Sequence, residues 1–142
     1  ILLDSDILFD PLIIKILLDA SHDNCLALDS HKLGEEEIKV IVNERNQITE
    51  ISKTCSIEKA IGESIGIEKM SHAYLLALHE ELEQMIKHEK LDNVFYELAF
   101  ERLIARGQYF YPVDTSAYFS MELDTPEDFH DAMNRIPKHL QA

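Results

Sequence analysis

Residues 60–71, AIGESIGIEKMS, hold a strand pattern and a helix start in direct succession. Ile65 and Ile67 predict a strand over residues 63–70. Ser71 is a residue type that caps helices, because its hydroxyl accepts a hydrogen bond from an unpaired backbone N–H. Apolar residues recur along the following segment at helical spacings of three and four, at Leu75, Leu78, Leu82, Met85 and Ile86. A strand that passes into a helix is typical of an α/β protein.

Upstream of this stretch, apolar runs alternate with capping and turn residues. The apolar start of the chain ends at Asp4-Ser5-Asp6, which is typical of a buried strand with a polar tip. Asp10 and Pro11 predict the cap and first position of a helix that runs to about residue 20. Further strands are expected over residues 24–28, 38–42 and 47–53, and the last two form a hairpin.

The same alternation continues downstream. Asn93 predicts the cap of a helix that ends near Gly107. Strands are expected over residues 109–113 and 118–123, and Thr125-Pro126-Glu127-Asp128 predicts a capping box at the start of a last helix. The apolar face of that helix would consist of Phe129, Met133 and Ile136. Strands and helices that alternate around a central hairpin predict an α/β protein with a mixed sheet flanked by helices.

The charge balance limits the partners of the chain. Its 142 residues contain 13 Lys and Arg against 27 Asp and Glu, which gives a formal net charge of −14. Nucleic acids and anionic membrane surfaces are therefore not expected partners, because binding to them depends on Lys and Arg. No apolar run approaches a bilayer span, and Cys25 and Cys55 do not form a metal-binding spacing. The length predicts one domain over residues 1–142, and the absence of a signal pattern favours a cytoplasmic protein.

Two pairs of carboxylates follow predicted strands. Asp4 and Asp6 end the first strand, and Glu122 and Asp124 end the last one. Residues at i and i+2 of a strand share one face, and ligands of open α/β sheets bind beyond the carboxyl ends of the strands. If the two pairs meet over one crevice, they form an oxygen-rich site for Mg²⁺. Alternatively, these acids only cap the helices that follow them.

Other residues suit substrate contacts. Lys39 and Lys53 in predicted strands could hold an anionic phosphate, or they could be solvated lysines at a strand edge. Glu63 could accept hydrogen bonds from substrate hydroxyls, or it could be an exposed acid at a strand start. The aromatic and acidic residues 95–97, Phe-Tyr-Glu, suit a quaternary ammonium group. The alternative for this last group is an ordinary core at helical spacing.

Six segments, read in order, resemble one protein family. They are LLDSDILFDP (residues 2–11), EEEIKVIV (35–42), ITEISK (48–53), AIGESIGIEKMS (60–71), NVFYELAFERLI (93–104) and MELDTPEDFHDA (121–132). Together they are similar to the carboxyl-terminal part of the sugar-1-phosphate and phosphocholine-type nucleotidyltransferases. That family has a Rossmann-like, glycosyltransferase-A-type fold. The resemblance covers nearly the whole chain and is most specific at residues 62–71 and 122–128.

The resemblance, joined to the residue types above, implies a role for each candidate. The expected catalytic residues are Asp6, Lys53 and Asp124. The expected metal ligands are Asp6, Glu122 and Asp124. The expected substrate contacts are Asp4, Lys39, Glu63, Asn93, Tyr96 and Glu97. Ser120-Met121 stands where the family often has a Trp.

In the family's reaction, a phosphate oxygen of the acceptor attacks the α-phosphorus of a nucleoside triphosphate, and pyrophosphate leaves. The resemblance implies Mg²⁺ as cofactor, CTP as the favoured donor, and phosphocholine or a sugar 1-phosphate as acceptor. The family's Gly-rich, triphosphate-binding loop is not in these residues. We therefore expect an N-terminal part of the domain ahead of Ile1, and no activity from this chain alone. Open alternatives are a non-catalytic binding or regulatory domain, an interaction module with a basic partner, and a homodimer.

Overall fold

In the computed structural model, which describes residues 1–141, the main sheet is built around β6 (Gly62–Lys69). Its residues confirm the strand predicted over residues 63–70. β6 pairs in antiparallel fashion with β1 (Leu2–Leu3), β3 (Cys25–Asp29) and β4 (Lys39–Val42). The stretch at residues 60–71 therefore supplies the central strand of the sheet.

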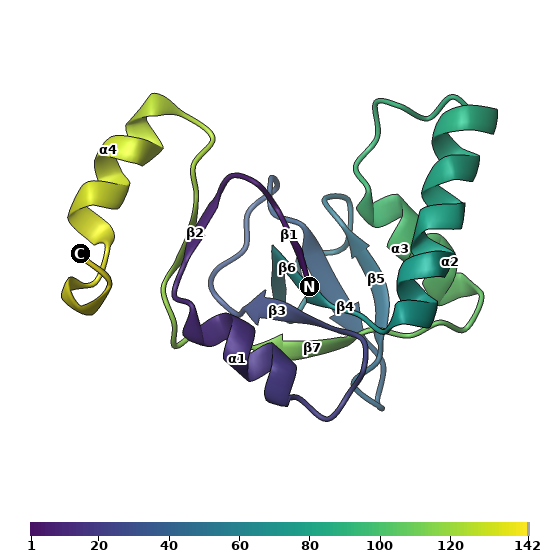
Figure 1. Cartoon of the computed structure of the whole chain (residues 1–142), viewed down its shortest axis with the longest axis horizontal. Coiled ribbons are helices and arrows are strands. Elements are labelled where there is room, and N and C mark those ends of the chain that lie inside the picture. The colour runs from purple at the N-terminus through teal and green to yellow at the C-terminus, as the bar shows by residue number, and fades with distance from the viewer. Residues whose placement is uncertain (142) are drawn as a thin grey trace.

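Two more strands complete this sheet. β5 (Ile48–Ser52) pairs with β4 as the predicted hairpin, and β7 (Tyr111–Asp114) pairs with β3 in parallel. The strand order is β5-β4-β6-β3-β7, with β1 also beside β6. This six-stranded mixed sheet with flanking helices confirms the predicted α/β class (Figure 1).

Helices cover both faces of the sheet. Neighbouring residues of a strand point to opposite faces, so the apolar residues of β3 contribute to a core on each side. On one face, α1 (Leu12–Asp19) packs its Ile13 and Leu17 against Cys25 and Ala27 of β3. On the other face, Leu26 and Leu28 of β3 belong to a larger core. α2 (His72–Glu83) and α3 (Glu97–Ala105) cover this core, with Leu78, Phe100 and Leu103 among its members. A π-helical turn over Gln84–His88 continues α2.

Two predicted helix starts are confirmed at the atomic level. The Ser71 hydroxyl accepts a hydrogen bond from the Tyr74 backbone N–H, which caps α2. The fourth helix, α4 (Pro126–Arg135), begins with a capping box between Thr125 and Asp128. A short 3₁₀ turn, Lys138–Leu140, follows α4.

The start of the chain differs from the single strand that was expected. After β1 the chain bends at Asp4-Ser5-Asp6 and continues as β2 (Ile7–Phe9), which leaves the main sheet. β2 pairs in antiparallel fashion with β8 (Ser120–Glu122) and forms a separate two-stranded ribbon. Figure 1 shows this ribbon beside the sheet, between the sheet and α4. The partner of β2 lies more than a hundred residues away, so local sequence did not indicate it.

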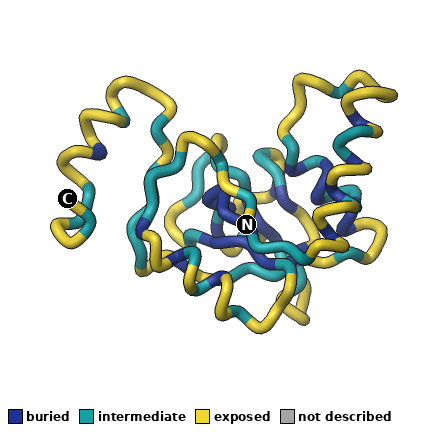
Figure 2. The backbone as a smooth tube through the Cα atoms, in the orientation of Figure 1, coloured by how far each residue is buried: buried dark blue, intermediate teal, exposed yellow. Residues whose placement is uncertain are grey.

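Three expectations about helices are wrong. α3 begins at Glu97 rather than at Asn93, which is exposed in the preceding turn. On α2, Leu75 is 48% exposed, while Tyr74 is buried, because the face that meets α3 sets the orientation of the helix. On α4, Phe129 and Met133 are exposed, and Ala132 is its buried residue. Figure 2 shows that most of this helix is exposed. Among the helices of residues 1–141, none has the length and apolar character needed to cross a membrane.

Candidate functional site

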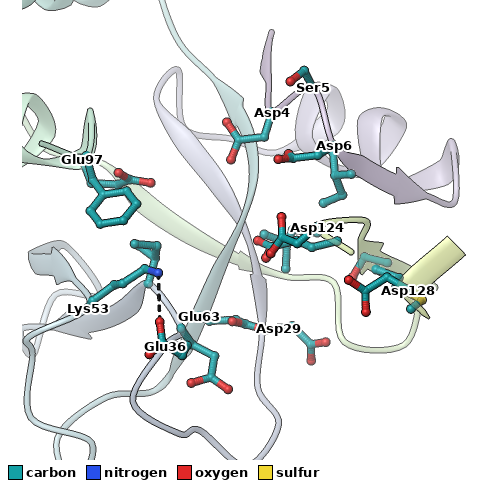
Figure 3. Close-up of a pocket in the computed structure, with 18 of the residues that line it drawn as sticks. Asp4, Ser5, Asp6, Asp29, Glu36, Lys53, Glu63, Glu97, Asp124 and Asp128 are labelled. Atoms are coloured by element: carbon teal, nitrogen blue, oxygen red, sulfur yellow. Dashed lines mark hydrogen bonds and ion pairs between the residues drawn. The ribbon is translucent and has the colours of Figure 1, made fainter. Parts of the chain in front are cut away.

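A large pocket of about 960 Å³ opens beside the ribbon, and carboxylates dominate its lining. The acidic residues that line it are Asp4, Asp6, Asp29, Glu36, Glu37, Glu63, Glu97, Glu122, Asp124 and Asp128. The basic residues that line it are His31, Lys53 and Arg135. The volume falls within the range of small-molecule sites. Figure 3 shows side chains from both sides of the pocket, with Lys53 and Glu97 on one side and Asp6 and Asp124 on the other.

The ribbon brings the two predicted pairs of acids together. Ile7 lies opposite Glu122 in the β2–β8 register, and the Leu123 N–H donates a hydrogen bond of 2.8 Å to the Asp6 carbonyl. Asp6 makes this contact and Asp124 directly follows it in the chain, and both line the pocket. The acids meet on an antiparallel ribbon beside the sheet, whereas the sequence suggested the carboxyl ends of strands in one sheet.

Asp4 is positioned by the main sheet. Its backbone N–H donates to the Gly66 carbonyl at 2.8 Å, and its Oδ1 accepts a hydrogen bond of 3.0 Å from the Tyr96 hydroxyl. Burial raises the pKa of the Asp4 carboxyl, and the Tyr96 hydrogen bond partly offsets the rise. Gly66 leaves space for this arrangement: a Cβ there would lie 2.1 Å from Asp4 Oδ2. Asp4 and Tyr96 both line the pocket, and their role as substrate contacts stays a prediction.

Two buried carboxylates lie near Asp4. Glu97, at the start of α3, is 6% exposed and lines the pocket, and its Oε2 has no hydrogen-bond partner among residues 1–141. Glu68 of β6 is 1% exposed, and its Oε2 also lacks a partner in this described part of the chain. Burial raises the pKa of Glu68 to about 8, and the charges of Asp4 and Glu97 add to the rise. Sequence reasoning missed Glu68, although an acid in an otherwise apolar strand was a detectable signal.

Lys53 supplies a positive charge to the pocket from the end of β5. Its Nζ lies 4.7 Å from the centre of the Phe95 ring and 3.3 Å from Glu36 Oε2. The Glu36 side chain is 91% exposed, so this ion pair holds Lys53 only weakly. Lys53 can therefore exchange Glu36 for an anionic ligand in the same pocket.

Two expected substrate contacts lie outside the pocket. Lys39 is 1% exposed, and its Nζ donates hydrogen bonds to the backbone carbonyls of Gly34, Glu35 and Glu37. Its charge therefore stabilises the preceding loop, because a buried ammonium needs such partners. Asn93 is exposed in the turn before α3 and does not line the pocket. For these two residues, the structure gives a position that does not fit the predicted role.

Glu63 lies at the pocket wall with two neighbours that sequence reasoning missed. It faces Asp29 directly across the β3–β6 pair, and its Oε1 lies 2.5 Å from His31 Nε2. Burial raises the pKa of Glu63, while the hydrogen bond to Glu63 raises the pKa of His31. Within residues 1–141, these three side chains form the group whose donor atoms all lie within 4.8 Å of one another. Asp29 and His31 lie just beyond the strand expected over residues 24–28, so the sequence did not indicate their position beside Glu63.

The three residues predicted as magnesium ligands, Asp6, Glu122 and Asp124, are exposed carboxylates of the pocket. Partial burial raises the pKa of Glu122, and the carboxylates of Asp124, Glu63 and Asp6 add to the rise. All three predicted ligands offer hard oxygen donors, which suit Mg²⁺. They line the pocket without belonging to the tight group at Glu63.

Comparisons with known proteins identify the fold. No protein-family model and no curated protein matches the chain. Among solved structures, the inositol-1-phosphate CTP transferase from T. maritima matches 96% of this chain with a TM-score of 0.66. The two sequences are 18% identical, and the chain spans about half the length of that protein, 55% of it. The chain has the fold of part of a nucleotidyltransferase.

Proposed function

We propose that the protein containing this chain transfers a cytidylyl group from CTP to a phosphorylated alcohol or sugar and releases pyrophosphate. The observation that carries this proposal is the pocket in which carboxylates from both ends of the chain face Lys53. The fold shared with an inositol-1-phosphate CTP transferase supports the reaction class and favours CTP as the donor.

Mg²⁺ is the proposed cofactor, and Asp6, Glu122 and Asp124 are its proposed ligands. The mutual repulsion of these carboxylates supports the assignment, because a bound cation would relieve it. When bound, the ion would offset the negative charge that phosphate groups carry through the reaction. An acidic pocket can bind anionic substrates in this way, since the ion is then the largest local charge.

Lys53 is proposed to hold the phosphate of the acceptor. Its contact with the Phe95 ring keeps the ammonium at the pocket wall, and its exposed partner Glu36 is easily displaced. A fixed ammonium orients the attacking phosphate oxygen without taking part in bond making. For this kind of chemistry, positioning and charge stabilisation account for most of the catalysis.

The pocket wall around Glu97 favours an acceptor with a cationic group. Glu97 is buried with an unpartnered oxygen, and Tyr96 and Phe95 place aromatic side chains beside it. Carboxylates and aromatic faces attract quaternary ammonium groups. Phosphocholine is therefore our first candidate acceptor, and sugar 1-phosphates are the second.

Pyrophosphate release by the full-length protein tests the proposal. CTP, UTP, ATP and GTP would each be combined with phosphocholine, inositol 1-phosphate and glucose 1-phosphate in the presence of MgCl₂. We expect turnover with CTP and at least one acceptor, with phosphocholine giving the highest kcat/KM. A lack of pyrophosphate release from every pair would contradict the enzyme assignment and favour a non-catalytic domain.

Asp124→Asn tests the metal assignment separately. It should lower kcat/KM by about a hundredfold or more and weaken Mg²⁺ binding, because one anionic ligand is lost. Glu127→Gln is the matched control, since it removes one negative charge three residues away and outside the pocket. If Asp124→Asn and Glu127→Gln have equal activity, Asp124 is not a metal ligand.

A further inference from the structure

A second cluster in the pocket has the composition of a metal site different from the one proposed above. Asp29, His31 and Glu63 each offer one donor atom, and these atoms lie within 4.8 Å of one another. Two of the three come from paired strands, because Asp29 ends β3 and lies opposite Glu63 of β6. The carboxylates are therefore held by the sheet rather than by a loop.

The two carboxylates repel each other unless a cation, either a protonated His31 or a metal ion, lies beside them. Like charges directly opposite each other on antiparallel strands destabilise the pair. Glu63 is also partly buried, with its side chain 21% exposed, and its neighbours include Glu37. A positive charge between Asp29 and Glu63 would remove this repulsion.

The His31 ring is oriented as a ligand. Its Nδ1 lies 2.9 Å from the Lys32 carbonyl oxygen, and a carbonyl can only accept, so Nδ1 carries a hydrogen. In the neutral ring, Nε2 then presents a lone pair, and this atom faces Glu63 Oε1 at 2.5 Å. A backbone carbonyl that fixes the second ring nitrogen is the usual outer contact of a metal-bound histidine. Two lone pairs that face each other need a proton or a metal ion between them.

We propose that Asp29, His31 and Glu63 bind a divalent transition-metal ion, with Zn²⁺ and Mn²⁺ as the best candidates. One imidazole nitrogen and two carboxylate oxygens suit these ions, whereas Mg²⁺ prefers oxygen donors alone. All three residues line the pocket, so a bound ion would be accessible from the space where substrates would bind. The site is separate from Asp6, Glu122 and Asp124 and does not depend on the proposed transferase activity.

Calorimetric titration of the full chain with ZnCl₂ alone tests this site. We expect His31→Ala and Glu63→Gln each to lower the Zn²⁺ affinity at least tenfold. Glu36→Gln is the matched control, because Glu36 is an exposed carboxylate of the same pocket outside the cluster, and it should stay within twofold of wild type. Circular dichroism of each variant verifies that the fold is retained.

A second readout locates the ion. In side-chain NMR spectra of the seven histidines, one equivalent of Zn²⁺ should shift the Nε2 resonance of His31 in the wild type and in Asp124→Asn. Absence of Zn²⁺ binding, or equal affinity in all variants, would overturn the proposal. So would a loss of affinity confined to Asp124→Asn, which would place the ion at the other site.

Discussion

Gly66 is the residue on which the position of Asp4 depends. It has a φ of +70°, and a Cβ at this position would lie 2.1 Å from Asp4 Oδ2. We predict that Gly66→Ala lowers the free energy of unfolding by about 2–4 kcal/mol, because backbone strain and a displaced Asp4 add together. Urea denaturation measures this loss.

Gly107→Ala separates the two causes. Gly107 has a φ of +84°, but nothing lies within 4 Å of its Cβ position, so that variant carries backbone strain alone. We expect it to cost about 1 kcal/mol. Equal losses in the two variants would show that Asp4 does not need the space left by Gly66.

Glu68 should make the stability of the protein fall as pH rises. Its ordinary pKa of 4.5 is raised to about 8 by burial, with Asp4 and Glu97 adding to the effect. Between these values, the folded state keeps a proton that the unfolded state has released, so unfolding becomes easier with rising pH. One such proton changes the free energy of unfolding by about 1.4 kcal/mol per pH unit.

Glu68→Gln isolates this contribution, because the neutral amide resembles the protonated carboxyl. From pH 6 to pH 8, the free energy of unfolding should fall in the wild type by about 2 kcal/mol more than it falls in Glu68→Gln. Glu127→Gln, which removes an exposed carboxylate, should keep the wild-type dependence. If the free energy of unfolding depends on pH in the same way in Glu68→Gln and the wild type, Glu68 ionises normally in the folded protein.

Residue types alone predicted part of the candidate site. Asp4, Asp6, Glu122 and Asp124 could be selected because paired acids beside strands are locally visible, and all four line the pocket. The burial of Lys39 could not be predicted, because the three carbonyls around its ammonium come from a loop that folds back on it. Tertiary contacts of this kind decide whether a charged side chain binds a ligand or stabilises a loop.

At the scale of elements, a hairpin and two helix caps could be predicted from local sequence, whereas the Asn93 cap was wrong and the distant pairing of β2 was missed. The β4–β5 hairpin and the Ser71 and Thr125 caps depend on neighbouring residues, and the structure contains all of them. β2 escaped prediction because three residues carry little pattern and its partner β8 lies far along the chain. This missed ribbon is the element that joins the two acidic pairs.

The capping box of α4 should hold the end of the segment that carries the proposed Mg²⁺ ligands Glu122 and Asp124. Thr125 Oγ1 accepts from the Asp128 N–H, and Asp128 Oδ2 accepts from the Thr125 N–H at 2.7 Å. We predict that Thr125→Ala costs about 1 kcal/mol, confined to α4, since few residues of that helix are buried. Hydrogen exchange should accelerate at α4 amides but not at α3 amides.

Thr125→Ser is the control for this prediction, because serine keeps the capping hydroxyl. Its exchange rates should stay close to wild type. Since Asp124 directly precedes the cap, Thr125→Ala should also weaken Mg²⁺ binding while Thr125→Ser should not. Unchanged exchange in α4 of Thr125→Ala would show that packing rather than the cap holds this helix.

At the scale of the whole molecule, the net charge of −14 concentrates in one place. The pocket collects carboxylates from the bend after β1, the ribbon, β3 and β6, and it has few basic side chains to balance them. A chain with this excess of negative charge is destabilised by self-repulsion. Cations should therefore stabilise the fold in two ways, by general screening and by specific binding.

Thermal unfolding in MgCl₂ and NaCl of equal ionic strength separates these two effects. A ligand at one hundred times its Kd stabilises the folded state by about 2.7 kcal/mol, which corresponds to a rise in Tm of roughly 5–10 °C for a chain of this size. We predict that MgCl₂ raises the Tm of the wild type by this amount beyond NaCl, because screening is equal in the two salts. Asp124→Asn should lose most of the difference while keeping the response to NaCl. If NaCl and MgCl₂ raise the Tm equally, the pocket carboxylates respond only to screening and hold no specific Mg²⁺ ion.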